Sequence, residues 1–344
     1  MNRLFLILLL PFVLLSCKAD FSPNADWKEV PSVYCVLDQD DSISYVRVQK
    51  CYLGSGNLKG YSQVADSTNY AAGELSVKIL VWGSASDMAR DGAIPLRTLN
   101  FDYTVLDDKS EGSFASPQQP VYCHVNAAGD LDPDNYYQLI VSKSATGQVI
   151  ARSSTWLIGD AQHDPWIDRP HPTIFGRSIS FRRQASCPIE WYAFPQGRRY
   201  QFDIRYYYRN FYLEPDSLRW VDMSLPVITS NLNERTLTTN LALSTFLAEI
   251  EHALANDTNT KVFVDSALVS LAVCNEPLNA YLNSIDMIKY ASSQEQQLYS
   301  NIKGGVGVFG SRRAHLKLLV PTDNSDTPPM GLRYQIAQLG VGFN

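Results

Sequence analysis

The chain lacks any apolar run long enough to cross a membrane as a helix, and it lacks the short patterns of common catalytic sites. Its longest apolar run, residues 4–15, has 12 residues, whereas a spanning helix needs about 20. No Gly-x-Ser-x-Gly, His-Glu-x-x-His, P-loop or Cys-x-x-Cys pattern occurs. We therefore predict no catalytic residue, no metal site and no cofactor, and we expect a protein that is not an enzyme.

Positive charge is also scarce. The 29 Lys and Arg residues are outnumbered by 35 Asp and Glu residues, which gives a formal net charge of −6 and a pI near 5.4. A nucleic-acid-binding domain is typically basic, so we expect no nucleic-acid partner. Hydrophobic residues make up 45% of the chain, enough for a sizeable core, and the 19 Tyr residues favour strands.

The beginning of the chain is its most distinctive part. A charged start is followed by the apolar run of residues 4–15, which Leu14-Leu15-Ser16-Cys17 closes. Such a layout describes a removable secretion signal, and the cysteine at its end makes it a bacterial lipobox. We predict a signal peptide over residues 1–16, lipid attachment at Cys17 and a polar tether over residues 17–28. An ordinary signal with a coincidental cysteine is the alternative.

Five cysteines remain once Cys17 is assigned to the lipid: Cys35, Cys51, Cys123, Cys187 and Cys274. Five is an odd number, so at least one has no partner within the chain. Export permits disulfides, and small buried apolar side chains are the other interpretation. The pairing stays open.

Residues 29–160 have the pattern of a β-sandwich. About seven short strand-like segments are separated by turns rich in Asp, Gly and Ser. Near the end of this region, Asp134-Asn135-Tyr136-Tyr137 resembles the start of the penultimate strand of immunoglobulin-like and fibronectin-like domains, where a Tyr bonds back to the chain. We predict an N-terminal immunoglobulin-like or fibronectin-like antiparallel sandwich in a mainly β protein.

Residues 161–172 are rich in Pro, Asp and His and lack periodicity, so we place a linker there. Residues 173–344 predict a second β-rich domain with two helices. Its clearest strand is residues 199–209, in which aromatic and aliphatic residues alternate with mostly charged ones. Helices are expected near 244–255, and near 276–298 after the capping sequence Asn275-Glu276-Pro277.

A family resemblance rests on residues 299–310, whose sequence is Tyr-Ser-Asn-Ile-Lys-Gly-Gly-Val-Gly-Val-Phe-Gly. This segment resembles the NI-x-G-G-x-G-x-F-G ending of a Bacteroidota family of lipid-anchored cell-envelope proteins that carry a domain of unknown function. A Leu-x-x-Tyr-Leu helix precedes that ending, as Leu278, Tyr281 and Leu282 do here. The resemblance implies a lipobox, an early β-sandwich and an association with TonB-dependent outer-membrane receptors, and it supplies no catalytic residue.

The glycines of this segment also spell Gly-x-Gly-x-x-Gly over residues 305–310. A dinucleotide site requires that pattern between a strand and a helix, whereas here it follows a predicted helix and precedes a predicted strand. We therefore expect a backbone role for these glycines, either a positive φ or close packing.

Two polar groups have residue types that bind cations. Residues 130–134 (Asp-Leu-Asp-Pro-Asp) have the alternate spacing of a calcium loop, but the Gly and the final Glu of an EF-hand are absent. Two His and two Asp residues within 163–171 are ligand types for zinc. We expect an acidic turn and an ordinary polar loop, and we assign no metal.

The outer face of the 199–209 strand carries the candidate ligand site. Arg205, Tyr207 and Arg209 offer guanidinium groups and an aromatic plane suited to an anionic or glycan ligand. A solvated sheet face with cross-strand pairs is the alternative. Three pairs of adjacent arginines add local positive charge: 182–183, 198–199 and 312–313. They suit an acidic partner or lipid head groups.

These features predict an outer-membrane or cell-surface lipoprotein, held to the membrane by its lipid. We expect a non-enzymatic binding or accessory component whose partner is a TonB-dependent receptor or a glycan. A structural or adhesive surface protein is one alternative. An uncharacterised envelope hydrolase with its site between the two domains is the other.

Overall fold

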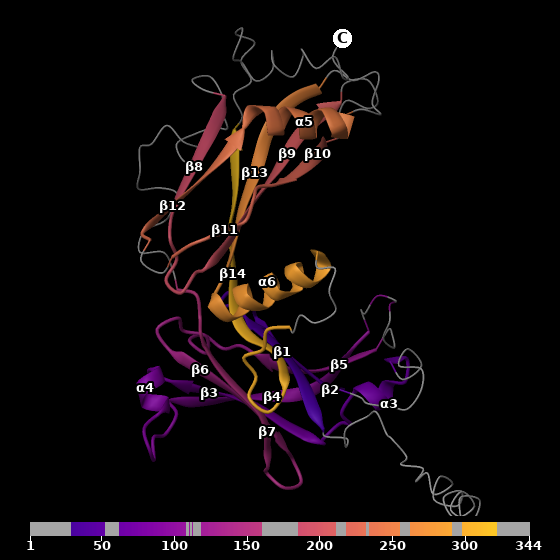
Figure 1. Ribbon diagram of the computed structural model, residues 1–344, viewed down its shortest axis with the longest axis vertical. Coiled ribbons are helices and arrows are strands. Elements are labelled where there is room, and N and C mark those ends of the chain that lie inside the picture. The colour runs from indigo at the N-terminus through magenta and orange to yellow at the C-terminus, as the bar shows by residue number, and fades with distance from the viewer. Residues whose placement is uncertain are drawn as a thin grey trace, which may run out of the picture.

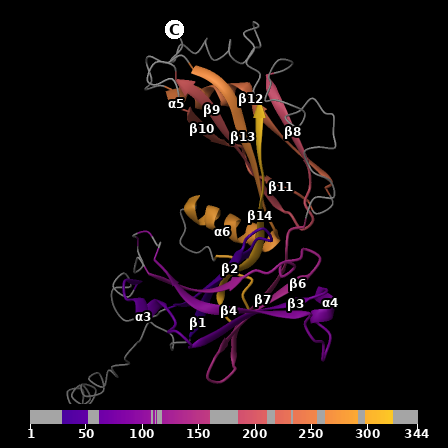
Figure 2. The same cartoon turned by 180° about the vertical axis from the view of Figure 1, so that it is seen from behind.

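The computed structural model describes residues 29–51, 62–107, 110, 112, 118–159, 185–210, 218–231, 234–254, 262–290 and 298–321. They form two β-rich lobes placed end to end, and the helix α6 (Glu276–Tyr290) lies between the lobes (Figure 1). The view from behind shows the same two lobes joined at the level of α6 (Figure 2). Strands dominate the described ranges, so the predicted mainly β fold is confirmed.

The N-terminal lobe is an antiparallel sandwich. Its strands are β1 (Val30–Leu37), β2 (Ile43–Cys51), β3 (Leu75–Trp82), β4 (Arg97–Leu106), β5 (Gln119–Val125), β6 (Tyr136–Lys143) and β7 (Val149–Trp156), with single-turn helices α3 (Ala65–Thr68) and α4 (Ala85–Met88) in the connections. One layer has the order β1-β2-β5 and the other β3-β6-β7, while β4 pairs with both β5 and β3. This order matches the predicted immunoglobulin-like or fibronectin-like sandwich.

The core of this lobe forms from side chains at every second position of its strands. In β1 every second side chain is buried, and β3 follows nearly the same pattern. Val33, Leu37 and Ile79 are consequently at 0% exposure. Burying a large apolar side chain contributes roughly 1.5–3 kcal/mol, so the pattern holds the two layers face to face.

Tyr137, the second residue of β6, holds the turn that precedes this strand. Its ring is fully buried, and its hydroxyl accepts a hydrogen bond from the N–H of Asp132 at 2.6 Å. The same hydroxyl lies 3.1 Å from the carbonyl oxygen of Asp130 and 3.0 Å from that of Asp132, to which it donates. Burial raises the pKa of Tyr137 to about 12, so the phenol remains protonated. The Tyr that was predicted to bond back to the chain is this residue.

The C-terminal lobe is a sheet backed by a two-stranded ribbon and a helix. The sheet has the order β10 (Leu218–Ser224), β9 (Arg199–Asn210), β13 (Val262–Cys274) and β14 (Val306–Pro321), with β11 (Ile228–Thr229) on β9; the ribbon pairs β8 (Ser186–Tyr192) with β12 (Thr236–Ala242), and α5 (Leu243–Leu254) follows β12. The predicted alternation of β9 is confirmed, because Phe202, Ile204 and Tyr206 are buried. They share a core with Trp191 and Phe246.

Both predicted helices are present. α5 covers Leu243–Leu254, one residue earlier than expected, and α6 begins at Glu276 directly after the predicted capping Asn275. The described part of α6 ends at Tyr290, and residues 291–297 lie outside the described ranges. In the part of the chain that the structure describes, no helix is both long and apolar enough to span a membrane.

A single strand belongs to both lobes. The first part of β14, Val306 to Ser311, pairs in parallel with β1 of the sandwich. The part from Arg312 onward pairs antiparallel with β13 of the C-terminal sheet. One hydrogen-bonded sheet therefore continues through both lobes. The predicted linker at 161–172 lies outside the described residues, and the prediction of two successive domains did not include this shared strand.

At the start of β14, the backbone of Gly305 and Gly307 packs directly against the backbone of β1. The Asn301 side chain accepts a hydrogen bond from the N–H of Phe309 at 2.9 Å and donates to its carbonyl oxygen at 2.8 Å. Gly307 has φ +119°, and a Cβ at this position would overlap the carbonyl oxygen of Val33. The predicted backbone role is therefore confirmed, since the glycines let β14 approach β1.

One buried amide joins the elements that meet between the lobes. Asn275, which is 3% exposed, accepts hydrogen bonds at Oδ1 from the N–H groups of Ser311 at 3.1 Å and Leu278 at 3.4 Å. Its Nδ2 donates to Thr155 Oγ1 at 2.8 Å and to the Trp156 carbonyl oxygen at 2.9 Å. All the hydrogen-bonding capacity of the amide is thus used to cap α6, hold β14 and reach β7.

We expect Gly307→Ala to lower the free energy of unfolding by about 3 kcal/mol or more, because the new methyl group displaces β1 from β14. Gly147→Ala is the matched control, since Gly147 also has a positive φ, +71°, but has open space around it. The control should cost only about 1–2 kcal/mol of backbone strain. Urea unfolding measures both variants, and equal losses would contradict the close packing.

We expect Asn275→Asp to cost at least about 3 kcal/mol, because a buried carboxylate has no hydrogen to donate to the Trp156 carbonyl oxygen. The substitution preserves the side-chain shape, so the loss reports hydrogen bonding. Asn100→Asp, at an exposed position of β4, should change stability by less than about 0.5 kcal/mol. Similar unfolding midpoints for the two variants would show that the amide is not essential.

Candidate functional site

The outer face of the C-terminal sheet carries three short rows of side chains. The registers of β10, β9 and β13 set the rows, which are Trp220–Tyr207–Ser266, Asp222–Arg205–Leu268 and Ser224–Asp203–Ser270. The residues between them in sequence, such as Ile204, Val221 and Val269, face the core. The nine side chains of these rows therefore face outward, and we call them the outer grid.

Arg205 lies at the centre of the outer grid. Its Nε is 2.7 Å from Asp222 Oδ1 and its Nη2 is 2.9 Å from Asp222 Oδ2, which makes a bidentate ion pair. The guanidinium also stacks over the Trp220 ring at 5.1 Å from the ring centroid. The hydrogen bond from Arg205 holds the pKa of Asp222 below its usual range, so this pair stays ionised at neutral pH.

A hollow of about 370 Å³ is lined by two rows of the outer grid, the row of Arg205 and the row of Asp203. Its lining side chains include Asp203, Arg205, Asp222, Ser224, Leu268 and Ser270. Ser224 donates a hydrogen bond to Asp203 at 2.6 Å. The row of Trp220 and Tyr207 adjoins the hollow, and Trp220 is 53% exposed. A polar depression with an aromatic border can bind a small ligand that has both polar and apolar faces.

The structure brings together two of the three predicted ligand-binding residues. Arg205 and Tyr207 lie on the same face of β9, and Arg209 continues the strand, but its side chain lies outside the described part. Sequence reasoning missed Asp222 and Trp220. Their alternation with buried residues of β10 was a usable signal, but only the register places them opposite Arg205 and Tyr207.

The arginine pairs within the described ranges are held in ion pairs. These are Arg198–Glu276 at 2.7 Å, Arg199–Asp286 at 3.3 Å, Arg312–Asp38 at 3.7 Å and Arg313–Asp40 at 3.4 Å. They fasten α6 and the turn after β1 to neighbouring strands. Acidic side chains of the protein itself thus pair with these four arginines. This pairing disfavours the predicted contact with an acidic partner or lipid head groups.

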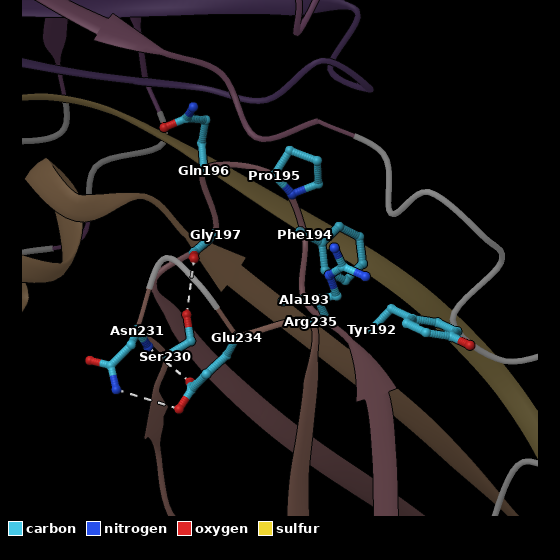
Figure 3. Close-up of a pocket in the computed structure, with 10 residues that line it drawn as sticks. All are labelled: Tyr192, Ala193, Phe194, Pro195, Gln196, Gly197, Ser230, Asn231, Glu234 and Arg235. Atoms are coloured by element: carbon cyan, nitrogen blue, oxygen red, sulfur yellow. Dashed lines mark hydrogen bonds between the residues drawn. The ribbon is translucent and has the colours of Figure 1, made fainter.

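A second hollow, of about 410 Å³, lies between the β8–β9 turn and the segment that joins β11 to β12 (Figure 3). Residues 192–197 line one side, and Ser230, Asn231, Glu234 and Arg235 line the other. Gln196 has φ +63°, an unusual backbone conformation for a residue with a Cβ. The preceding carbonyl oxygen, of Pro195, accepts a hydrogen bond from Gly159 at 3.1 Å, which places this turn at the boundary of the lobes.

Polar groups of this second hollow bind one another. Glu234 accepts hydrogen bonds from the N–H of Asn231 at 2.9 Å and from its side chain at 3.4 Å, and Ser230 donates to the Gly197 carbonyl oxygen at 3.2 Å. Neither His nor Cys is among the described residues that line the hollow. This lining does not pair a nucleophile with a base, so it gives no support to a hydrolase.

The acidic turn at 130–134 binds its own chain. Asp130 lies 3.1 Å from Arg97 Nη1 and 3.2 Å from His124 Nε2, and it accepts a hydrogen bond from the N–H of Ala127 at 2.8 Å. Burial opposes ionisation of Asp130, but these contacts outweigh it and hold its pKa below the usual range. Among the residues with described positions, no three His, Cys, Asp or Glu side chains are grouped to hold a metal.

Cys35, Cys51, Cys123 and Cys274 are free thiols. Cys35, Cys187 and Cys274 are buried, which agrees with small apolar side chains. Burial raises the pKa of the Cys35 thiol and so makes it unreactive. Cys17 and the His and Asp residues of 163–171 lie outside the described residues.

A charged cluster surrounds the point where the described chain begins. Lys143 Nζ lies 2.6 Å from Glu29 Oε1 and 3.2 Å from Glu74 Oε1, and Lys50 Nζ lies 3.6 Å from Glu74. Both ammonium groups are about 5 Å from the centroid of the Tyr70 ring. Partial burial opposes ionisation of both glutamates, yet their contacts with Lys143 help to hold both glutamate pKa values below the usual range.

A scan of the chain against protein-family models finds no match, and a search of curated proteins finds no similar sequence.

We expect Lys143→Met to lower stability by about 1 kcal/mol at pH 7, a small value because the three side chains are partly exposed. The lowered glutamate pKa values add stability above the ordinary value of 4.5, and that stability is lost as pH falls through the folded-state values. The difference from the unmodified protein should therefore shrink towards pH 3. Thermal melts at both pH values test this. Lys78→Met, on a neighbouring strand, is the control, and an equal, pH-independent loss in both variants would contradict the prediction.

Proposed function

We propose that this chain is a lipid-anchored binding protein of the bacterial envelope, without catalytic activity, that works beside a TonB-dependent outer-membrane receptor. The observation that carries the proposal is Leu14-Leu15-Ser16-Cys17 at the end of a short apolar run. The resemblance of residues 299–310 to the Bacteroidota family supports the same location and the same kind of partner.

The arrangement of the lobes supports a binding role. The tether of residues 17–28 would reach at most about 40 Å when extended, and it leads to Glu29 at the start of the N-terminal lobe. The outer grid is on the C-terminal lobe, at the other end of the molecule (Figure 1). A lipid on Cys17 would thus present the grid away from its point of attachment.

We expect Cys17→Ser to move the protein from the membrane fraction to the soluble fraction, because the thiol that carries the lipid is lost. Mass spectrometry of the unmodified protein should find an N-terminal Cys17 with attached acyl chains. Cys123→Ser, which removes a half-buried thiol of the sandwich, should stay with the membrane. A Cys17→Ser protein that still pellets with membranes would contradict the lipid anchor.

Crosslinking in intact cells, followed by pulldown through the chain, separates the candidate roles. Recovery of a TonB-dependent receptor supports the accessory role. Self-association or capture of host material without a receptor would instead indicate an adhesive protein. Turnover of envelope polymers by the purified chain would indicate a hydrolase and overturn the proposal.

A further inference from the structure

We propose that the outer grid binds neutral carbohydrate, with a sugar ring against Trp220 and its hydroxyl groups bound by the Asp222–Arg205 pair. The inference rests on the proposed function, because it names the ligand class of that binding protein. Four observations carry it: an aromatic pair whose Trp220 is exposed, an oriented ion pair, the charge of the grid and the hollow beside it.

The aromatic pair supplies an apolar surface in a polar setting. Trp220 is 53% exposed although it lies in the middle of β10, and Tyr207 is its partner across the strands. Covering a large aromatic side chain with an apolar surface of a ligand lowers the free energy of the complex. The C–H groups on one side of a sugar ring are flat and apolar, so they can cover an indole ring.

The ion pair supplies oriented hydrogen-bonding groups. The contacts of Arg205 Nε and Nη2 with Asp222 fix the guanidinium and the carboxylate in one plane beside Trp220. A guanidinium has five N–H donors and a carboxylate about four acceptor positions, so groups of both kinds remain for a ligand. Neighbouring sugar hydroxyls, each a donor and an acceptor, match this pair.

The charge of the grid disfavours the anionic ligand considered from the sequence. Its charged side chains are Asp203, Asp222 and Arg205, two carboxylates to one guanidinium. A cationic ligand at Trp220 is also disfavoured, because the Arg205 guanidinium, which lies over this ring, would repel it. A neutral ligand rich in hydroxyl groups is the class that remains.

The hollow beside the aromatic pair supplies room and further partners. Its volume is about 370 Å³, with Leu268 as an apolar side chain and Ser224 and Ser270 as hydroxyl groups. Asp203 is held in place by Ser224 at 2.6 Å and by Gln201 at 3.3 Å. Such fixed polar groups select hydroxyl-bearing ligands over analogues that lack the hydroxyl.

The test is native affinity electrophoresis of the full lipidated chain in detergent. The gels contain mannan, xyloglucan or dextran as neutral probes, and dextran sulfate or polylysine as charged probes. We expect at least one neutral polymer to retard the protein. Trp220→Ala and Asp222→Asn should each weaken that binding at least tenfold, whereas Trp220→Phe should retain part of it.

Tyr45→Ala is the matched control, because Tyr45 is a 41% exposed aromatic residue on a strand of the other lobe. It should leave the retardation unchanged. Unchanged melting temperatures for the grid variants would show that they still fold, and the partial binding of Trp220→Phe is an independent check. Binding of a neutral probe should also change the tryptophan fluorescence, and this change should be smaller in Trp220→Phe.

Three results would overturn the inference: no retardation by any neutral polymer, retardation by charged polymers alone, or neutral binding that survives both Trp220→Ala and Asp222→Asn. None of these results touches the proposed function itself, because membrane fractionation of Cys17→Ser and receptor recovery are measured independently of carbohydrate. A soluble, unlipidated protein that binds mannan through Trp220 would overturn only the proposed function.

Discussion

Four hydrogen bonds of one buried amide, that of Asn275, join elements of both lobes at the place where the lobes meet. Asn275 is bonded to β14, to the first turn of α6 and to the end of β7. At this boundary β14 passes from the sandwich to the C-terminal sheet, and a small apolar cluster of Cys274, Leu278 and Val308 lies apart from the two larger cores. Because every polar atom of the amide is used, neither a shorter nor a charged side chain can replace it.

The shared strand explains the distribution of glycine in the C-terminal part of the chain. β14 must lie against β1 closely enough for parallel pairing and then leave it for β13. At Gly307 a side chain would meet the backbone of β1. The segment that resembles a family signature is therefore a packing requirement of the fold, and its Gly-x-Gly-x-x-Gly pattern needs no nucleotide to explain it.

Local features were predictable and register was not. The alternation of β9, the capping role of Asn275 and a corner Tyr within residues 134–137 were all predicted, because each depends on residues close in sequence. Arg205 and Tyr207 were placed on one strand face for the same reason. The partners Asp222 and Trp220 depend on how β10 pairs with β9, and the exchange of β14 between lobes depends on contacts across most of the chain. The alternation within β10 indicates which of its side chains face outward, but neither strand pairing leaves a pattern in the sequence.

The parallel pairing of β1 with β14 also determines how the molecule would carry mechanical load. A pull applied to the chain ahead of Val30 would enter at the first residues of β1, while the C-terminal lobe is attached to the far end of β14. The two strands would then be drawn in opposite directions along their length. In this shear geometry the hydrogen bonds that join residues 32–37 of β1 to residues 306–311 of β14 resist the force together. If β1 were instead peeled from one end, these bonds would break one at a time.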